Sequence, residues 1–129
     1  MANETVFVVD DEPLNTRLIQ VNLQVKGYKI EIAHDGVEAL EALESGRVKP
    51  DLMLLDLTMP YMDGFELLNR IKANSELSAI PVVILSARAH DKDVVIGHAI
   101  GAERYLTKPI NPTELVKTVR DVLDERTTA

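Results

Sequence analysis

The chain has 129 residues, of which 46% are hydrophobic, and its formal net charge at pH 7 is −7. This length and composition predict one domain over residues 1–129 with a substantial core, and they exclude an intrinsically disordered chain. The acidic balance disfavours nucleic acid and anionic membranes as partners, while the absence of cysteine excludes disulfides and thiolate metal sites and favours a reducing cytoplasm.

Five short segments of the chain are predicted to be β-strands. Four of them are continuous apolar runs, a pattern typical of parallel strands that helices cover on both faces. The remaining one, Ile30–Ala33, is less apolar, so we expect it nearer an edge of the sheet. The four continuous runs are Val6–Val9, Leu52–Leu55, Val82–Leu85 and Tyr105–Thr107.

The first helix is predicted from an apolar stripe at positions i, i+4, i+7 and i+11. Its residues are Leu14, Leu18, Val21 and Val25, and we expect this stripe to face the core. Ile19 and Leu23 lie off the stripe, so they are either part of a partner surface or loose apolar patterning.

The later helices are predicted from shorter apolar repeats and from their first residues. The repeats lie within residues 37–43, 65–71, 94–99 and 115–123. Asp35, Asp63 and Asn111 each precede a glutamate by three residues, which is a capping-box pattern. Gly27 and Gly101 lie where helix C-terminal stops are expected. The strand–helix alternation, repeated five times, predicts a three-layer, doubly wound α/β domain with a five-stranded parallel sheet.

Polar residues follow the predicted strands at the points where the strands end. They are Asp10, Asp11, Asp56, Ser86 and Lys108. Parallel strands bring these positions to one edge of the sheet, where open α/β sheets bind ligands. Carboxylates without cysteines or paired histidines favour Mg2+ over zinc, and Asp56 is the best candidate nucleophile for a phosphoryl group.

These residues and their order resemble the receiver domain of two-component response regulators, as found in single-domain chemotaxis-type regulators. The matching segments are Asp10-Asp11, Asp56-Leu-Thr-Met-Pro60-Tyr-Met-Asp-Gly64, Ser86-Ala87 and Gly101-Ala-Glu-Arg-Tyr105-Leu-Thr-Lys108-Pro109. The resemblance covers essentially the whole chain and implies the flavodoxin-like strand order 2-1-3-4-5.

The resemblance also implies a role for each residue of the site. Asp56 would accept the phosphoryl group, and Ser86 and Lys108 would contact it. Asp11 and Asp56 would ligate Mg2+ together with the backbone carbonyl of Thr58, and Asp10 would act through water. The remaining implied roles are a conformational switch through Ser86 and Tyr105, modulation of autodephosphorylation by Thr58 and Arg88, and a cis peptide bond before Pro109.

Partners are likewise implied by the resemblance. A histidine kinase or histidine phosphotransfer protein would be the donor, docking on the first helix and the loop after the fifth strand, where Leu14 and Ile110 would border the site. A downstream protein would bind the face made by the fourth helix, fifth strand and last helix, with Ile96, Tyr105 and Val116. We expect a monomer or weak dimer without direct nucleic-acid contact, and no membrane insertion because no apolar stretch approaches ~20 residues.

Three other functions remain open from the residues alone. A Mg2+-dependent phosphatase with an aspartate nucleophile would need a second aspartate where this chain has Thr58. A flavin carrier would need a phosphate-binding loop after the first strand, where Asp10-Asp11-Glu12 would repel phosphate. A receiver that only binds and is never phosphorylated would fail to bind Mg2+.

Overall fold

The computed structural model describes residues 3–57, 62–87 and 100–128. Its five strands are β1 (Thr5–Val9), β2 (Lys29–Ala33), β3 (Leu52–Asp56), β4 (Val82–Ser86) and β5 (Arg104–Thr107). They form a single parallel sheet in the order β2-β1-β3-β4-β5. The predicted fold class, strand order and edge position of Ile30–Ala33 are therefore confirmed.

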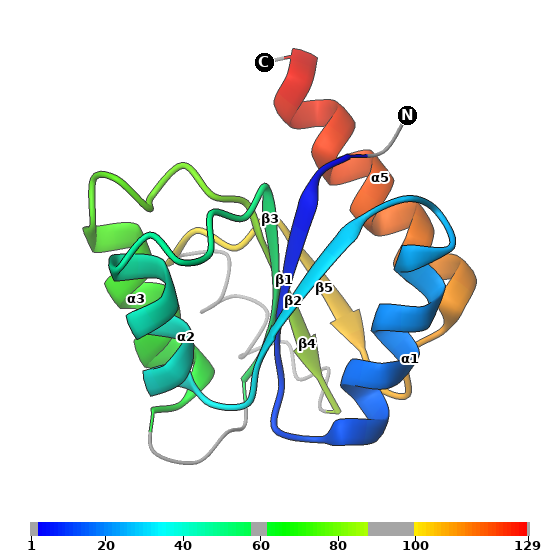
Figure 1. Ribbon diagram of the computed structural model, residues 1–129, viewed down its shortest axis with the longest axis horizontal. Coiled ribbons are helices and arrows are strands. Elements are labelled where there is room, and N and C mark those ends of the chain that lie inside the picture. Colours follow the sequence, from blue (N-terminus) through cyan, green and yellow to red (C-terminus); the bar gives the residue numbers. More distant parts are fainter. Residues whose placement is uncertain (1–2, 58–61, 88–99, 129) are drawn as a thin grey trace.

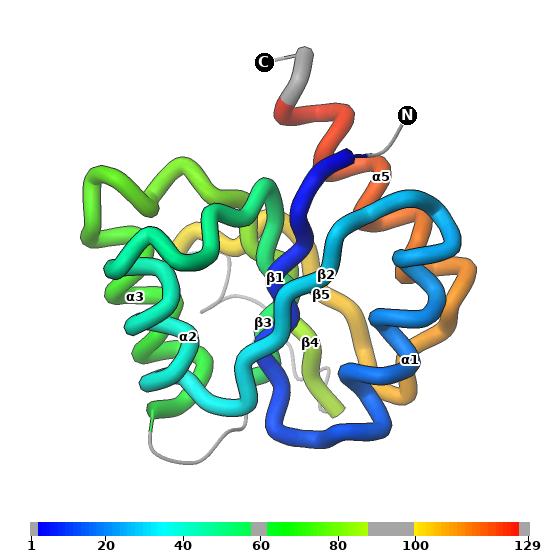
Figure 2. Tube along the Cα trace, in the orientation of Figure 1, coloured from blue at the N-terminus to red at the C-terminus, as the bar shows by residue number. Residues whose placement is uncertain are grey.

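Helices cover both faces of this sheet (Figure 1). On one side lie α1 (Pro13–Gln24) and α5 (Pro112–Thr128), and on the other lie α2 (Gly36–Glu44) and α3 (Gly64–Ala73). Figure 2 shows that the start of β1 and the end of α5 lie at the same end of the molecule. Among the described residues, no helix has the length and apolar character needed to cross a bilayer.

The central strands are apolar on both faces because each face has its own core. In β1, Phe7 and Val9 pack with α2 and α3, whereas Val6 and Val8 pack with α1 and α5. All of these side chains are fully buried. The continuous apolar runs thus correspond to strands buried on both sides, as expected for a parallel sheet with helices on each face.

The helix boundaries follow the capping chemistry that the sequence predicts. The side-chain oxygens of Asp35, Asp63 and Asn111 accept hydrogen bonds from the backbone N–H groups three residues later, at 2.8, 2.9 and 3.0 Å. Gly27 and Gly101 have φ angles of 94° and 124°, a backbone region that favours glycine. The helix predicted within residues 94–99 lies outside the described residues.

The predicted orientation of α1 is wrong. Most of the predicted core stripe faces solvent: Leu14 is 83% exposed, Val21 51% and Val25 76%. Leu18 is half-buried and packs against the core. The buried face instead contains Thr16, Ile19 and Leu23, so the last two are core residues and not a partner surface.

The physical reason is that α1 carries two stripes with helical spacing. The buried stripe is hard to recognise in the sequence because it includes the polar residue Thr16. The hydroxyl of Thr16 donates to the carbonyl of Pro13 at 3.0 Å, so it has a hydrogen-bond partner although it is buried. Ile110, which we expect to border the site, is 7% exposed and belongs to the core cluster that includes residues of α1 and α5. Val37, predicted to share a buried stripe in α2, is 51% exposed.

Candidate functional site

The predicted site residues lie at the carboxyl ends of neighbouring strands. Asp10 follows β1, Asp56 is the last residue of β3, and Ser86 is the last residue of β4. Lys108 follows β5, and its backbone N–H donates to the carbonyl of Ser86 at 2.7 Å. The parallel register therefore places side chains from four strands along one edge of the sheet.

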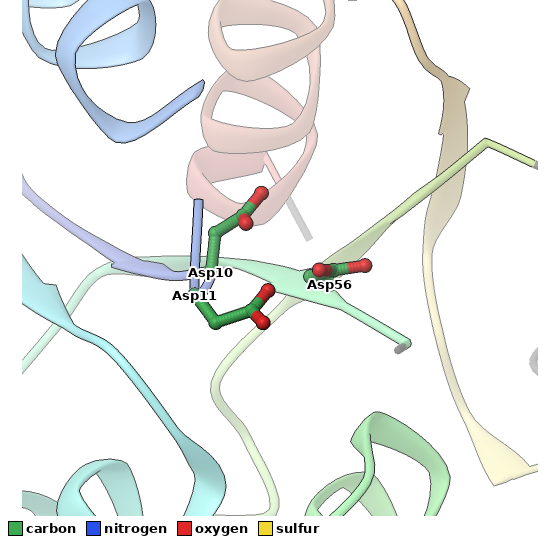
Figure 3. A group of neighbouring side chains, drawn as sticks. All are labelled: Asp10, Asp11 and Asp56. Carbon is green, nitrogen blue, oxygen red and sulfur yellow. The ribbon is translucent and has the colours of Figure 1, made fainter. Parts of the chain in front are cut away.

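Three carboxylates meet at this edge, in what we call the acidic notch (Asp10, Asp11 and Asp56). One carboxylate oxygen from each lies within 4.8 Å of the other two, and Figure 3 shows the side chains entering the same space from the ends of β1 and β3. Asp10 and Asp56 are buried whereas Asp11 is exposed. Like charges held this close repel one another unless a cation compensates them.

Lys108 supplies part of that compensation. Its Nζ lies 2.9 Å from Asp10 Oδ2 and 3.3 Å from Asp56 Oδ2, and its side chain is only 10% exposed. Burial by itself lowers the pKa of Lys108, but the contact with Asp10 and the charges of Asp10 and Asp56 outweigh it, so the pKa is raised above its ordinary value of 10.5. The lysine is therefore a fixed positive charge at neutral pH.

Backbone hydrogen bonds hold the notch in place. Asp10 donates its N–H to the carbonyl of Ala33 at 3.1 Å, while its Oδ1 accepts from the N–H of Glu12 at 2.9 Å. No group other than Lys108 among the described residues is a partner for Asp10 Oδ2. The Lys108–Pro109 peptide bond is cis, the isomer that the family resemblance implies.

Gly64 fixes the backbone around Asp56, a role that the sequence motif does not explain by itself. Its N–H donates to the carbonyl of Leu57 at 2.9 Å. A Cβ at this position would lie 2.4 Å from the carbonyl oxygen of Asp56 and 2.6 Å from the Cα of Leu57. Only glycine lets the start of α3 approach the end of β3 this closely.

The other predicted site residues fall into two groups. Ser86 is 5% exposed and ends β4, the strand next to β3, whereas Tyr105 is half-buried on β5 and packs against the core beneath α2 and α3. Thr58, Arg88 and Ile96 lie outside the described residues. Sequence reasoning missed Glu12, whose Oε1 lies 3.8 Å from Lys108 Nζ; its place beside the acidic pair was the available signal.

The acidic notch suits a hard divalent cation. Its ligands are all carboxylate oxygens, two of them on buried side chains, and Mg2+ prefers such oxygens while keeping several waters. The exposure of Asp11 leaves one side of the notch open to water. The residues present thus fit Mg2+, and the carboxylates available to hold it are those of Asp10, Asp11 and Asp56.

Comparison with known proteins identifies the family. A family model described as the response regulator receiver domain matches residues 6–120. The chain belongs to the response regulator receiver domains. It is therefore a phosphoacceptor switch domain of two-component signalling. This assignment displaces the phosphatase and flavin-carrier hypotheses.

Two of the similar curated proteins are bacterial transcriptional regulatory proteins. The transcriptional regulatory protein TrcR of Mycobacterium tuberculosis is 39% identical over 118 residues, covering 92% of this chain and 44% of TrcR. The alkaline phosphatase synthesis transcriptional regulatory protein PhoP of Bacillus subtilis is 37% identical over 121 residues, covering 94% of this chain and 49% of PhoP. The chain thus spans about half the length of these relatives.

Solved structures of similar length share the whole fold. The chemotaxis protein CheY4 of Vibrio cholerae is 33% identical with a TM-score of 0.85, covering 94% of this chain and 99% of CheY4. The Mn(2+)-bound form of the response regulator Rcp1 is 32% identical with a TM-score of 0.80, covering 92% of this chain and 91% of Rcp1.

Proposed function

We propose that this receiver domain takes a phosphoryl group onto Asp56 from a histidine kinase or a histidine phosphotransfer protein, in a Mg2+-dependent reaction. The observation that carries the proposal is the contact between the buried carboxylate of Asp56 and the ammonium of Lys108, inside a cluster of three aspartates. A buried nucleophile with a fixed cation and a cation-binding notch beside it is suited to phosphoryl transfer.

In the proposed reaction, a carboxylate oxygen of Asp56 forms a bond to phosphorus as the bond from phosphorus to the donor nitrogen breaks. The electron pair of that bond leaves with the donor imidazole. Lys108, held as an ammonium by Asp10, stabilises negative charge on the phosphoryl oxygens. Ser86, the last residue of β4, would donate its hydroxyl to one of them. Bound Mg2+ would supply additional neutralisation of this charge.

The proposed switch follows from the same residues. A phosphoryl group on Asp56 adds negative charge beside Lys108 and Ser86, and their reorganisation would shift the domain between two states. Tyr105 on β5 is our candidate for transmitting this shift to a downstream protein, together with the neighbouring parts of α5. Thr58 and Arg88 remain our candidates for modulating hydrolysis of the phosphoaspartate, which the domain would catalyse on itself.

The exposed stripe of α1 supports a docking surface for the donor. Leu14 follows Asp11 by three residues and is 83% exposed, and Val21 and the C-cap residue Val25 continue the apolar line of the helix. A helix of the donor packed along this line would reach the notch at its Leu14 end. The output face expected to include Val116 needs revision, because Val116 lines a hollow that α5 shares with α1.

The test is phosphorylation by acetyl phosphate, followed by intact mass. Wild-type protein should gain one phosphoryl group with Mg2+ and none with a chelator. Asp56→Asn should gain none under either condition. Asp63→Asn is the matched control, because asparagine also caps a helix and α3 is preserved. Equal phosphorylation of Asp56→Asn and wild type would refute the proposal.

Domain extent over residues 1–129, the cytoplasmic location and the monomeric or weakly dimeric state remain predictions from the sequence. Lack of phosphorylation in wild-type protein, together with absent Mg2+ binding, would favour a receiver that acts only as a binding module.

A further inference from the structure

A groove is lined by residues of α2, by Met62 and by Arg70 of α3. The helices α2 and α3 lie on the face of the sheet opposite α1 and α5 (Figure 1). The volume of the groove is about 510 Å³, and its lining includes Val37, Leu40, Glu41, Glu44, Met62 and Arg70. The apolar part consists of Leu40 and Met62, which are almost buried, and of Val37, which is 51% exposed. An adjoining hollow continues past Val37 toward Glu38 and Arg47.

The charge along this groove is negative. The α2 sequence contains three glutamates and no basic residue, and Glu41 and Glu44 line the groove without an ion pair to any described residue. Arg70, the cation on the α3 side, is 3.1 Å from Glu66 and is therefore already compensated. An apolar strip bordered by unpaired carboxylates complements an apolar strip bordered by cations.

The groove is also connected to the phosphoacceptor strand through close backbone packing. Met62 lines the groove, and its carbonyl oxygen lies 2.7 Å from where a Cβ of Gly36 would be, so it touches the first turn of α2. Two residues later, Gly64 touches the carbonyl of Asp56 in the same way. A shift of the backbone at Asp56 would therefore act by direct packing on the segment that contains Gly64 and Met62, and Met62 lines the groove.

We propose that this groove docks an amphipathic helix of a partner protein whose apolar face is bordered by lysine or arginine, and that phosphorylation alters its affinity. The predicted effect of phosphorylation on affinity rests on the proposed function of Asp56. By linkage, a helix that binds the phosphorylated form more tightly also favours phosphorylation of the domain. This surface is separate from α1 and from β5 and α5.

The probe is a synthetic peptide of about 14 residues, roughly four helical turns, with leucines on one face and lysines beside them. Its control carries glutamates in place of the lysines. Binding to the full chain is measured by fluorescence anisotropy at low and high salt. The lysine peptide should bind, and should weaken as salt rises, whereas the glutamate peptide should bind about tenfold more weakly or not at all.

Variants locate the binding. Val37→Asp and the double charge reversal Glu41→Lys/Glu44→Lys should each weaken the lysine peptide about tenfold. Val25→Asp at the C-cap of α1 and the double reversal Glu31→Lys/Glu114→Lys make the same changes at exposed positions elsewhere, and should leave the affinity for the lysine peptide within about twofold. Equal losses in the control variants, or equal binding of the two peptides, would overturn the proposal.

The third experiment measures binding of the lysine peptide to phosphorylated protein. In samples whose intact mass shows the phosphoryl group, affinity for the lysine peptide should change by at least about threefold, with no change in Asp56→Asn. An unchanged affinity in phosphorylated protein would refute the coupling, whereas failure to phosphorylate would instead refute the proposed function. Self-association that Val37→Asp abolishes, without peptide binding, would assign the groove to a second copy and contradict the proposal.

Discussion

Replacing Lys108 by methionine isolates the electrostatic contribution of this lysine to the free energy of unfolding. Methionine keeps an apolar stem of similar length but leaves Asp10 and Asp56 without the cation at 2.9 and 3.3 Å. At an effective dielectric constant of about 20, each contact contributes on the order of 5 kcal/mol of attraction, much of which offsets desolvation. Removing one partner of a buried pair costs about 3–5 kcal/mol. We expect Lys108→Met to lower the free energy of unfolding by about 3 kcal/mol.

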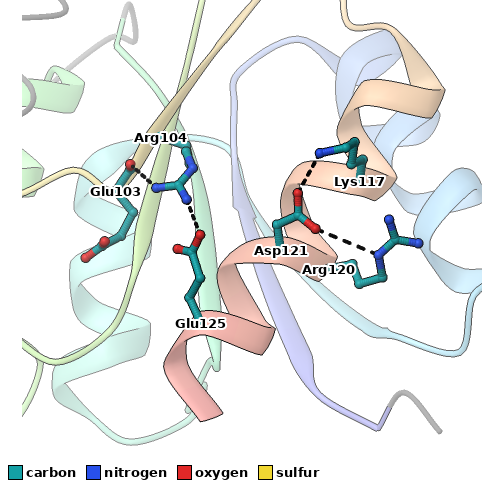
Figure 4. A network of polar contacts seen from close by, with 6 residues as sticks. All are labelled: Glu103, Arg104, Lys117, Arg120, Asp121 and Glu125. Atoms are coloured by element: carbon teal, nitrogen blue, oxygen red, sulfur yellow. Dashed lines mark hydrogen bonds and ion pairs between the residues drawn. The ribbon is translucent and has the colours of Figure 1, made fainter. Parts of the chain in front are cut away.

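The assay is urea unfolding at neutral pH, with a chelator and with Mg2+. Lys117→Met is the matched control, because Lys117 pairs with Asp121 at 2.8 Å but is 67% exposed (Figure 4), so its loss should cost less than about 1 kcal/mol. Added Mg2+ should stabilise Lys108→Met more than wild type, since a bound cation compensates the same carboxylates. Equal stability of Lys108→Met and wild type in chelator would refute the reasoning.

The pKa of Lys108 is higher in the folded protein than its ordinary value of 10.5, so its stabilising contribution is complete below that pH and is lost as pH rises through the folded-state pKa. Wild-type unfolding free energy should therefore fall more steeply above about pH 10.5 than that of Lys108→Met, and parallel curves would contradict the assignment. Leu23→Ala should lower the free energy of unfolding by about 2–5 kcal/mol because Leu23 is fully buried. Leu14→Ala should change it by less than about 0.5 kcal/mol and should slow phosphoryl transfer from a histidine donor. If urea unfolding shows the larger loss for Leu14→Ala, α1 is oriented as the apolar stripe in the sequence predicts. Gly64→Ala should destabilise by about 1–3 kcal/mol, since its Cβ must displace backbone at Asp56, and should lower the initial phosphorylation rate; a variant with wild-type stability and rate would rule out this close approach.

Strand positions were predictable because the apolar signal is strong in each run, whereas the strand order was an implication of the family resemblance. Neither Val6–Val9 nor Val82–Leu85 contains a polar residue, so the sequence indicates directly that both runs are buried. Parallel strands then place Asp10 and Ser86 at the same edge of the sheet. The caps were also predictable, since an aspartate such as Asp35 bonds locally, to a backbone N–H only three residues away.

The orientation of α1 was not predictable from periodicity. Two stripes compete on this helix, and the choice between them depends on how α1 packs against the sheet and α5, which is a property of the assembled fold. Ile19 and Leu23 share the buried face with a threonine, whose polarity makes the stripe look incomplete. The approach of Gly64 to Asp56 is likewise a tertiary contact with no local sequence signal.

Tracing the phosphoryl group to a single side chain tests the central claim most directly. Wild-type protein is phosphorylated with acetyl phosphate and Mg2+, reduced with borohydride to convert the acyl phosphate to homoserine, digested, and sequenced by mass spectrometry. The account predicts homoserine at position 56 alone, next to the lysine that the fold holds 3.3 Å from its carboxylate. Homoserine at another aspartate, with position 56 unmodified, would contradict it.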